Sequence, residues 1–466
     1  MVILGLVLGG ALGFLFLCGV LLRWNDVKYR SEGLPPGTMG WPVFGETTEF
    51  LKHGPSFMKN QRARHGNLFK SHILGCPTVV SMDPEVNRFI LMNEGKGLVP
   101  GYPQSMLDIL GRWNIAAVHG ALHKSMRGVL LSLIGPTAIR EELLPKLDYF
   151  MRSHLCGWSG QTVDIQERTR EIAFLTSLKL IAGIEAGKIA DKLKEEFSMV
   201  VLGTLSLPID LPGTNYRRAF QSRKKIVSML RELVRERRRS SSTESRDMLS
   251  SLLQTEPKTG RELTDDQMID LLITIIYSGY ETVSTTSMMV LKYLHDHPRA
   301  LQEVREEHLA IRRRKSTGEA IDWEDYKSMN VTRAVIYETM RLATIVNGVL
   351  RKTTEDLQIK GFTIPRGWKI YVYTRETNYD PFQYPEPLRF NPWRWQDKSL
   401  ESHHYFTLFG GGSRLCPGKE LGVVKISIFL HYFLTSYRWE EVGGEEILQF
   451  PRVEAAKGLH IRLRDY

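Results

Sequence analysis

The sequence has few cysteines and lacks the spaced pairs that build metal clusters. Only four occur in 466 residues, Cys18, Cys76, Cys156 and Cys416, and none forms a Cys-x-x-Cys pair. A disulfide framework and a zinc cluster are therefore not expected. The chain also lacks internal repeats and a Gly-x-Gly-x-x-Gly turn, so we expect neither a solenoid nor a flavin or nicotinamide site of its own.

The composition excludes global disorder and points to a large folded body. Hydrophobic residues make up 42% of the chain, charged residues 24% and aromatic residues 10%, which is ample material for a core. The length predicts one large domain with two lobes, or two domains. The net charge of +10 fits nucleic acid, an anionic membrane surface or an acidic protein partner, and charge alone does not choose among them.

Residues 2–22 form an uncharged, mostly aliphatic run of 21 residues, long enough to cross a ~30 Å hydrocarbon core as a helix. We interpret it as a single transmembrane anchor. The alternative is a cleavable signal peptide, which usually begins with basic residues, and none precedes Val2. Arg23, Lys28 and Arg30 follow the run, so the positive-inside rule places the body on the cytosolic side.

Residues 23–45 are basic and rich in Pro and Gly and predict a linker, with the catalytic body at 46–466. Its Leu34–Pro42 part is either a stiff connector to the membrane or an ordinary loop, and both interpretations stay open. A basic stretch follows at Arg217–Arg246, where a solvated helix face is favoured over a binding site.

The body is predicted to be mainly α with a minor β region. A hairpin is expected over Asn67–Val80, and extended segments over Leu357–Ile364 and Trp368–Thr374. Helical periodicity dominates the remainder. The helical segments are Glu141–Phe150, Ile172–Ile184, Gln267–His295, Thr332–Leu342 and Lys419–His431.

The segment Phe409–Gly418 carries the strongest chemical signal. Gly410, Gly411 and Gly412 permit close backbone approach, and a helix begins after Pro417. Backbone N–H groups and a helix N-terminus stabilise a thiolate at Cys416 that could bind a metal. A lone cysteine is more often buried and inert. Yet Phe409, Gly412, Arg414, Cys416 and Gly418 in this spacing would arise by chance in on the order of one in ten thousand such chains.

This segment resembles the cysteine-ligand loop of the cytochrome P450 superfamily, Phe-x-x-Gly-x-Arg-x-Cys-x-Gly. The resemblance implies the cytochrome P450 fold, with haem b between a large helical lobe and a small β-rich lobe. Cys416 would be the axial thiolate of the iron and metal ligand. Phe409, Gly412, Arg414 and Gly418 would belong to the haem-binding loop.

A buried structural triad is implied by the same resemblance. Glu338 and Arg341 lie three residues apart on one helical face, where they can pair. In the superfamily an arginine from a later meander joins this pair. Arg389 takes that place here, although the preceding Leu388 replaces the more usual glutamate.

The segment Ser278–Thr282 resembles the oxygen-activation sequence of the superfamily, small-Gly-x-acid-Thr. By that resemblance Thr282 would hydrogen-bond dioxygen or a water molecule, and Glu281 would pass protons. Both would be catalytic. The structural alternative is a threonine whose hydroxyl bonds to its own helix, beside a surface glutamate. Ser278 departs from the usual Ala or Gly.

The resemblance also assigns cations and a donor to the haem propionates. Arg127, Arg351 and Arg414 match the positions of its arginine contacts. His123 stands four residues before Arg127, where tryptophan is commoner.

The implied reaction is the insertion of an oxygen atom into an apolar substrate. NADPH would supply electrons through a membrane-bound cytochrome P450 reductase, and the protein would face the cytosol from the endoplasmic reticulum membrane. Nucleic acid is not an expected partner, because no motif supports it. Four segments resemble plant steroid-modifying members of the superfamily: Leu34–Gly37 with Trp41-Pro42, Leu211–Thr214, Phe390–Trp395 and Phe409–Gly412. By this resemblance the chain looks nearest to the brassinosteroid-6-oxidases of plants, which convert a 6-deoxo steroid through a 6-hydroxy intermediate to the 6-ketone. Another plant terpenoid as substrate, or a non-catalytic membrane haem protein, are the alternatives.

Overall fold

The computed structural model describes residues 13, 16, 17, 19, 20, 22–239, 247–254, 263–403, 405–443 and 446–466. The predicted anchor at 2–22 lies largely outside these residues. Among the residues described, no helix is both long enough and apolar enough to cross a membrane. The chain divides into two compact units. The first is formed by the chain up to Pro103 with Asn347–Thr377, and the second by Gln104–Val346 with Asn378–Tyr466.

The first unit is built on a sheet with strand order β1-β2-β8-β5-β3. The predicted hairpin is confirmed as β1 (Leu68–Ile73) and β2 (Cys76–Ser81), which pair antiparallel. Leu74 and Gly75 turn the chain between them with φ of +54° and +73°. β8 (Lys369–Tyr373) lies parallel to β2, so strands far apart in the sequence share one apolar core.

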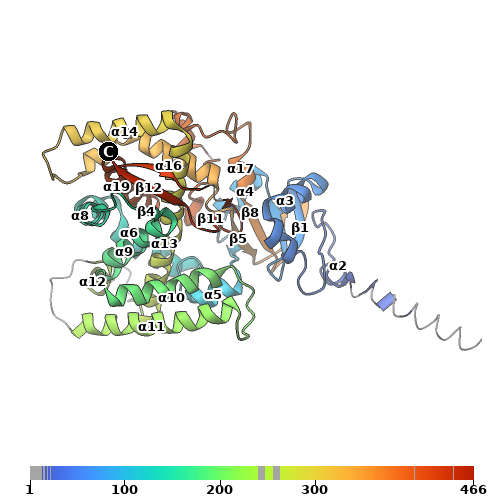
Figure 1. Cartoon of the computed structure of the whole chain (residues 1–466). Coiled ribbons are helices and arrows are strands. Elements are labelled where there is room, and N and C mark those ends of the chain that lie inside the picture. Colours follow the sequence, from blue (N-terminus) through green and yellow to red (C-terminus); the bar gives the residue numbers. More distant parts are fainter. Residues whose placement is uncertain are drawn as a thin grey trace, which may run out of the picture. The chain divides into compact units, whose positions relative to one another are not determined.

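The two further strands of that sheet and the remaining elements of this unit can be followed in Figure 1. They are α2 (Trp24–Lys28), α3 (Thr47–His65), α4 (Pro84–Met92), β3 (Leu98–Pro100), β5 (Gly348–Thr353), β6 (Leu357–Ile359) and β7 (Phe362–Ile364). The extended segments predicted at 357–364 and 368–374 are thereby confirmed as β6, β7 and β8. α17 (Arg375–Asn378) stands at the boundary with the second unit.

The second unit is mainly helical, as predicted, and α13 (Asp265–Asp296) is its longest element. A capping box closes its first turn: the Thr264 hydroxyl accepts from the Gln267 backbone N–H, and the Gln267 side-chain Oε1 accepts from the Thr264 backbone N–H. Most of its residues between Met268 and Leu294 are buried, so the helix runs through the core instead of along the exterior.

Helices on several sides bury α13. α9 (Ile165–Ala182) packs along it, and α10 (Lys188–Thr204) lies beside α11 (Asn215–Arg239) (Figure 1). α16 (Asn330–Ala343) and α19 (Lys419–Ser436) also contact it. The remaining helices are α5 (Gln104–Leu110), α6 (Gly120–Ile134), α7 (Pro136–Ala138), η1 (Ile139–Leu143), α8 (Leu144–Leu155), α12 (Met248–Gln254), α14 (Pro298–Arg313), α15 (Trp323–Ser328), η2 (Pro392–Gln396), α18 (Ser399–Ser402) and η3 (Gly412–Arg414).

Short strands complete the second unit. β12 (His460–Asp465) lies between β4 (Thr162–Asp164) and β9 (Tyr437–Glu441), and β10 (Ile447–Leu448) pairs with β11 (Glu454–Ala455). β4 leads directly into α9, so this sheet anchors one end of the helix that packs on α13.

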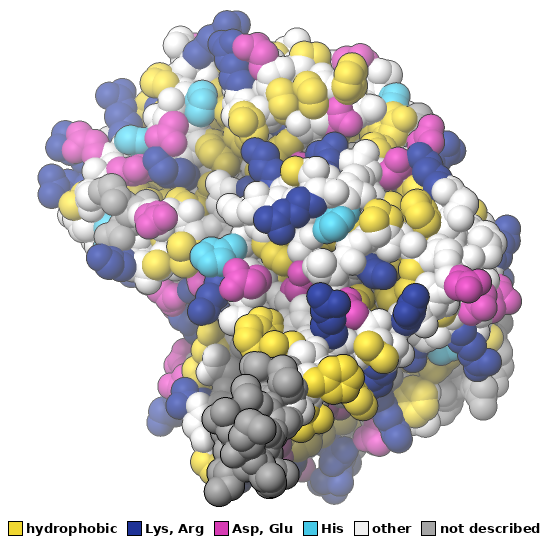
Figure 2. Space-filling model, turned by 90° about the vertical axis from the view of Figure 1, so that its right-hand side faces the viewer, with side chains coloured by type: hydrophobic (Ala, Val, Ile, Leu, Met, Phe, Trp, Pro, Cys, Tyr) yellow, Lys and Arg dark blue, Asp and Glu magenta, His cyan; other side chains and the backbone are white. Residues whose placement is uncertain are grey.

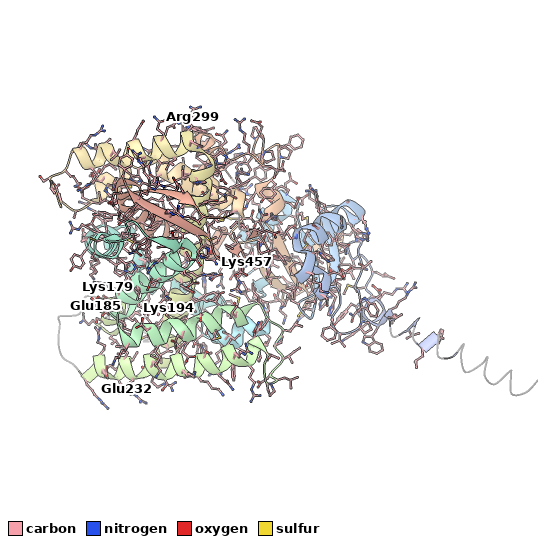
Figure 3. The ribbon with its side chains drawn as sticks, in the orientation of Figure 1. Lys179, Glu185, Lys194, Glu232, Arg299 and Lys457 are labelled. Carbon is pink, nitrogen blue, oxygen red and sulfur yellow. The ribbon has the colours of Figure 1, made fainter. Side chains whose placement is uncertain are left out.

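Charged side chains of both signs are interspersed over the face drawn in Figure 2. In the pair of Lys179 and Glu185, 3.1 Å apart and labelled in Figure 3, the glutamate is solvent-exposed and the lysine half-buried. Such pairs each contribute roughly 0–1 kcal/mol. The stability of the fold therefore rests mainly on its apolar core.

Candidate active site

The Cys416 loop is a tight turn that leads into α19. Gly410 and Gly412 have φ of +75° and +63°, a region that favours glycine. The Cys416 N–H donates to the Phe409 carbonyl at 2.9 Å, and α19 begins at Lys419, directly after Gly418. This geometry presents the thiol at the start of a helix.

The Cys416 thiol is accessible, although protein surrounds most of it. The residue is solvent-exposed, yet burial by its surroundings raises the pKa of the thiol. The Gly418 N–H and the Arg127 guanidinium act on this pKa in the opposite direction. Both would favour the thiolate form once an electrophilic metal is present.

Two predicted cations, Arg127 and Arg414, are close enough for their charges to interact with each other, and Arg127 interacts with Cys416. Desolvation lowers the pKa of Arg127, and none of the ion pairs among the described residues includes it. Arg414 donates to the carbonyls of Ile115 at 2.8 Å and Val118 at 2.5 Å. These bonds hold the segment that precedes α6 against the Cys416 loop.

His123 is buried on α6, one turn before Arg127. Arg351 belongs to the first unit and is buried there. Its Nε lies 3.7 Å from a Glu94 oxygen, and its Nη1 donates to the Leu350 carbonyl. A carboxylate within its own unit thus already faces this guanidinium, and its haem contact stays a prediction.

The predicted oxygen-activation segment lies in the middle of α13. Ser278 is exposed and Thr282 is half-buried, in a helix that is otherwise mostly buried. The Thr282 hydroxyl donates to the Ser278 carbonyl at 2.8 Å. This is the bond to its own helix that the structural alternative predicted. Its oxygen keeps lone pairs that can accept a hydrogen bond from water or substrate.

Gly279 provides a close approach between helices. A Cβ at this position would lie 2.9 Å from the Ser177 Oγ on α9 and 3.9 Å from the Lys425 Nζ on α19. A larger residue here would force the Ser177 side chain to move, which gives a packing reason for a glycine that costs about 1 kcal/mol of helix propensity.

Glu281 is enclosed, and the alternative of a surface glutamate does not describe it. Its side chain is 19% exposed, and the Arg452 Nη1 lies 3.8 Å from its Oε1. Burial raises the pKa of Glu281, while Arg452 and then Arg170 lower it and Glu454 raises it. Sequence analysis missed both arginines, since neither lies near Glu281 in the chain.

Glu338 and Arg341 form the predicted buried pair. Both side chains are fully buried, and Arg341 donates from Nη2 to Oε1 at 2.8 Å and from Nε to Oε2 at 2.9 Å. Such a two-point contact is the strongest geometry for an arginine and a carboxylate.

The predicted third member, Arg389, is wrong. Its guanidinium is 70% exposed and pairs with Glu386 at 3.3 Å, and it offers Arg341 only its backbone carbonyl. Arg394 takes its place, with its Nε 3.2 Å from the Glu338 Oε1. The Trp395 indole donates to Oε2 at 2.9 Å. The 3₁₀ turn of η2 directs these neighbouring side chains inward, which residue spacing alone did not reveal.

An aromatic cluster connects the buried pair to the Cys416 loop. Tyr337, next to Glu338, has its ring centroid 5.6 Å from Trp395 and 5.9 Å from Phe409, both edge-on. The Lys419 Nζ lies 5.6 Å from the ring centroid of Tyr337 and 5.3 Å from that of Phe409. Phe409 therefore packs the start of the cysteine loop onto α16.

A family model for cytochrome P450 matches residues 35–458. The chain belongs to the cytochrome P450 family. This membership confirms the family predicted from the cysteine loop, and the protein is a cytochrome P450 monooxygenase. The cytochrome P450 fold is confirmed as well, because a retinoic acid-bound cyanobacterial CYP120A1 structure matches with a TM-score of 0.85. That match has 26% identity and covers 94% of this chain and 100% of the other.

Similar P450 proteins come from plants. Cytochrome P450 85A1 of Solanum lycopersicum is 66% identical, and cytochrome P450 85A1 of Arabidopsis thaliana 63%, each covering 97% of both chains. A 3beta,22alpha-dihydroxysteroid 3-dehydrogenase of Arabidopsis thaliana is 36% identical over 96% of both chains. The similarity thus extends over nearly the whole length.

The residues present fit the haem that the P450 family carries. An accessible thiol at a helix start suits the iron, and the guanidinium groups of Arg127 and Arg414 suit the carboxylates of the porphyrin. A Cβ at Gly418 would lie 4.0 Å from Sγ, at van der Waals contact. Cys416 would hold the metal, with Arg127 and Arg414 beside it.

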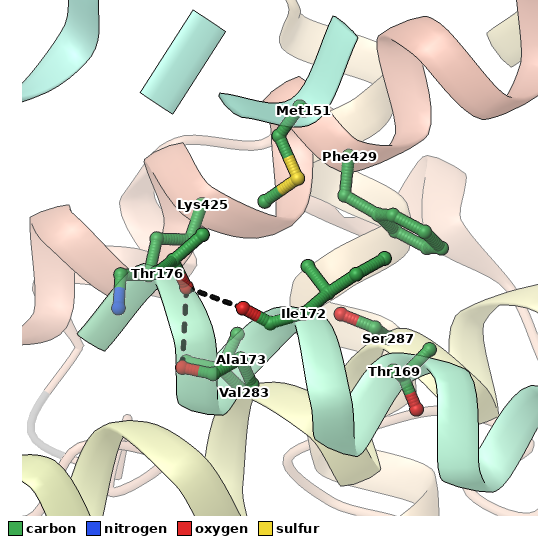
Figure 4. Close-up of a pocket in the computed structure, with 9 residues that line it drawn as sticks. All are labelled: Met151, Thr169, Ile172, Ala173, Thr176, Val283, Ser287, Lys425 and Phe429. Atoms are coloured by element: carbon green, nitrogen blue, oxygen red, sulfur yellow. Dashed lines mark hydrogen bonds between the residues drawn. The ribbon is translucent and has the colours of Figure 1, made fainter. Parts of the chain in front are cut away.

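Sequence analysis also missed Lys425, which lies on α19 close to Gly279 in the middle of α13. It is 4% exposed, and its Nζ donates to the Ser177 Oγ at 3.0 Å. Burial lowers its pKa to about 7. It lines a cavity of about 10 Å³ with Thr176, Ser287 and Phe429 (Figure 4), which is room for about one water molecule.

Proposed function

We propose that this chain oxidises C-6 of a 6-deoxo brassinosteroid precursor, through the 6-hydroxy compound to the 6-ketone, as in 6-deoxocastasterone to castasterone. The near full-length similarity to the P450 85A proteins carries the proposal. A more distant relative with a dihydroxysteroid in its name supports a steroid substrate.

Bound haem with a thiolate ligand supplies the activation of dioxygen for insertion into a C–H bond. Cys416 would provide that thiolate, with its field set by the Gly418 N–H and Arg127. Thr282 would accept a hydrogen bond at its hydroxyl oxygen, and Glu281 would take up protons and release them toward Thr282. The Glu338 pair and the aromatic cluster would keep the cysteine loop in place.

We further propose that the protein is anchored in the endoplasmic reticulum membrane by residues 2–22 and faces the cytosol. Cytochrome P450 enzymes need a redox partner, and here an NADPH-dependent cytochrome P450 reductase would supply the electrons. The sequence supports this arrangement through its apolar N-terminal run, the basic residues that follow it and the net charge of +10.

Reconstitution tests the substrate. The purified protein, with reductase and NADPH, is given 6-deoxocastasterone and a panel of other plant terpenoids, and products are identified by mass spectrometry. We expect the 6-hydroxy compound first and then the 6-ketone. Conversion of another terpenoid in place of every 6-deoxo steroid would contradict the proposal.

The ligand is tested separately from the substrate. Reduced protein with carbon monoxide should show the red-shifted Soret band of thiolate ligation. Cys416→Ser should lose this band, whereas Cys156→Ser, at another exposed cysteine, should keep it. An unchanged band in Cys416→Ser would show that another group binds the iron.

A further inference from the structure

Glu281, the acid of the proposed proton path, has an unexpected partner. Arg452 comes from the segment just before β11, and its Nη1 lies 3.8 Å from the Glu281 Oε1. Both side chains are about one-fifth exposed, at 20% and 19%. In such partly desolvated surroundings an opposite charge acts on a carboxyl more strongly than at an open surface.

The position of Arg452 is fixed by a second contact. The same Nη1 donates to the Val201 carbonyl at 3.3 Å, in the last turn of α10. That carbonyl lies at the negative end of the helix dipole, which favours a cation. The Thr204 hydroxyl donates to the same carbonyl at 3.0 Å and lies 3.1 Å from the Tyr277 hydroxyl, one turn before Glu281. Arg452 therefore joins the end of α10 to the centre of α13.

Of the other charged groups around Glu281, Arg170 also favours the ionised carboxyl, but less than Arg452 does. Arg170 on α9 pairs with Glu167 at 3.1 Å and with Glu454 at 3.6 Å, so carboxylates other than Glu281 face it closely. Glu454 disfavours an ionised Glu281. The described groups whose charges interact with Glu281 are Arg452, Arg170 on α9, Glu454 on β11, and Tyr277 and Tyr280 on α13. Glu167 on α9 interacts with Arg170 and Tyr280.

We propose that Arg452 is a positioning residue. Held at the end of α10, it orients the Glu281 carboxyl and supplies the positive charge that stabilises its ionised form. The role in proton delivery rests on the proposed function of Glu281. Burial and the nearby Glu454 both raise the pKa of Glu281, and without Arg452 only Arg170 would oppose them. The carboxyl would then keep its proton to higher pH and release it less readily.

Infrared titration of the haem-loaded protein tests the charge. The difference between each variant and its Glu281→Gln counterpart isolates the carboxyl band of Glu281. We expect the titration midpoint to rise by about one pH unit or more in Arg452→Gln. It should stay near the wild-type value in Arg452→Lys and in Arg462→Gln, which changes an exposed arginine on β12. Equal midpoints in the wild type and Arg452→Gln would overturn the proposal.

A second measurement follows the consequence for turnover. With reductase, NADPH and 6-deoxocastasterone, Arg452→Gln should release more hydrogen peroxide per NADPH, with its pH profile moved upward, and Arg452→Lys should restore the wild-type ratio. A loss in Arg452→Lys as large as in Arg452→Gln would show that charge is not the cause. Because the infrared titration needs no steroid, a shifted midpoint in a protein that converts no steroid would uphold Arg452 and contradict only the substrate.

Discussion

At the scale of single residues, Glu338 shows which partners a buried acid needs. It is fully buried and uses both oxygens, which accept from Arg341, Arg394, Trp395 and the Asn391 N–H. A buried carboxylate is tolerated only when its charge and lone pairs are matched in this way. The partners of Glu338 therefore matter far more than the arginines of the surface.

Replacing Arg394 should be much more damaging than replacing Arg389. Arg394→Ala leaves part of the buried Glu338 charge unmatched, and we expect the free energy of unfolding to fall by about 3–5 kcal/mol. Arg389→Ala removes only an exposed contact with Glu386 and should change it by less than about 0.5 kcal/mol. Denaturant unfolding followed by tryptophan fluorescence compares the two, and equal losses would contradict the correction of the triad.

Burial disfavours the charged form of Lys425 and lowers its pKa from 10.5 to about 7. Between these pH values the unfolded chain binds a proton that the folded chain does not. The free energy of unfolding should therefore rise with pH across this window, by at most about 1.4 kcal/mol per pH unit from this group. Below the window the cost of burying the ammonium is present in full.

Lys425→Met should remove this contribution. We expect the variant to gain stability over the wild type most clearly at and below pH 7, and the gain to shrink as the pH rises toward 10.5. Unfolding curves across that range measure the difference, with Lys398→Met as an exposed control. A gain that does not change with pH would mean that Lys425 keeps its ordinary pKa in the folded protein.

At the scale of elements, the helices were predictable where apolar periodicity is sustained. The sequence predicted a helix over Gln267–His295, and the structure has α13 over Asp265–Asp296. The difference at its start comes from the capping box of Thr264 and Gln267, a local signal that the sequence already contains. The closeness of α9 to α13 at Gly279 was not predictable, because periodicity gives no information on which helix faces a glycine.

The same Gly-to-Ala substitution should have opposite effects in two helices. In Gly279→Ala the new Cβ would stand 2.9 Å from the Ser177 Oγ, so overpacking of about 1–3 kcal/mol outweighs the propensity gain of about 1 kcal/mol. Gly128→Ala in α6 has no atom within 4 Å and should stabilise by roughly 0.5–1 kcal/mol. Thermal unfolding measures both signs, and stabilisation by Gly279→Ala would refute the close approach.

At the scale of the whole molecule, the net charge and the apolar N-terminal run bear on the predicted membrane location of the protein. The +10 charge fits attraction to an anionic membrane surface and an acidic reductase, and membership of the P450 family makes a redox partner necessary. The anchor stays a prediction of the sequence. Its physical basis is the cost of leaving 21 uncharged residues in water.

Deletion of residues 2–22 should therefore release the protein from membranes without destroying the haem site. We expect the full chain to stay in the membrane pellet after a carbonate wash, and the truncated chain to move largely to the supernatant while keeping its thiolate Soret band in carbon monoxide. Mass spectrometry of the full chain checks that its N-terminus is retained. A chain cleaved after this run would favour the signal-peptide alternative.

The sequence by itself determined the family, the metal-binding cysteine candidate and the mainly helical class. These depend on contiguous patterns: the loop Phe409–Gly418, the segment Ser278–Thr282 and the apolar periodicity of long helices. Local chemistry is sufficient for such features, because the residues that act together are neighbours along the chain or along one helix face.

Only the tertiary structure decided which distant residues meet. It assigned Arg394 instead of Arg389 to Glu338, Arg452 to Glu281, Glu94 to Arg351 and Ser177 to Lys425. In each case several charged or polar residues were equally plausible partners by spacing. The packing of separate helices and strands selected one of them, since a buried polar group must take the partner that the surrounding core brings within reach.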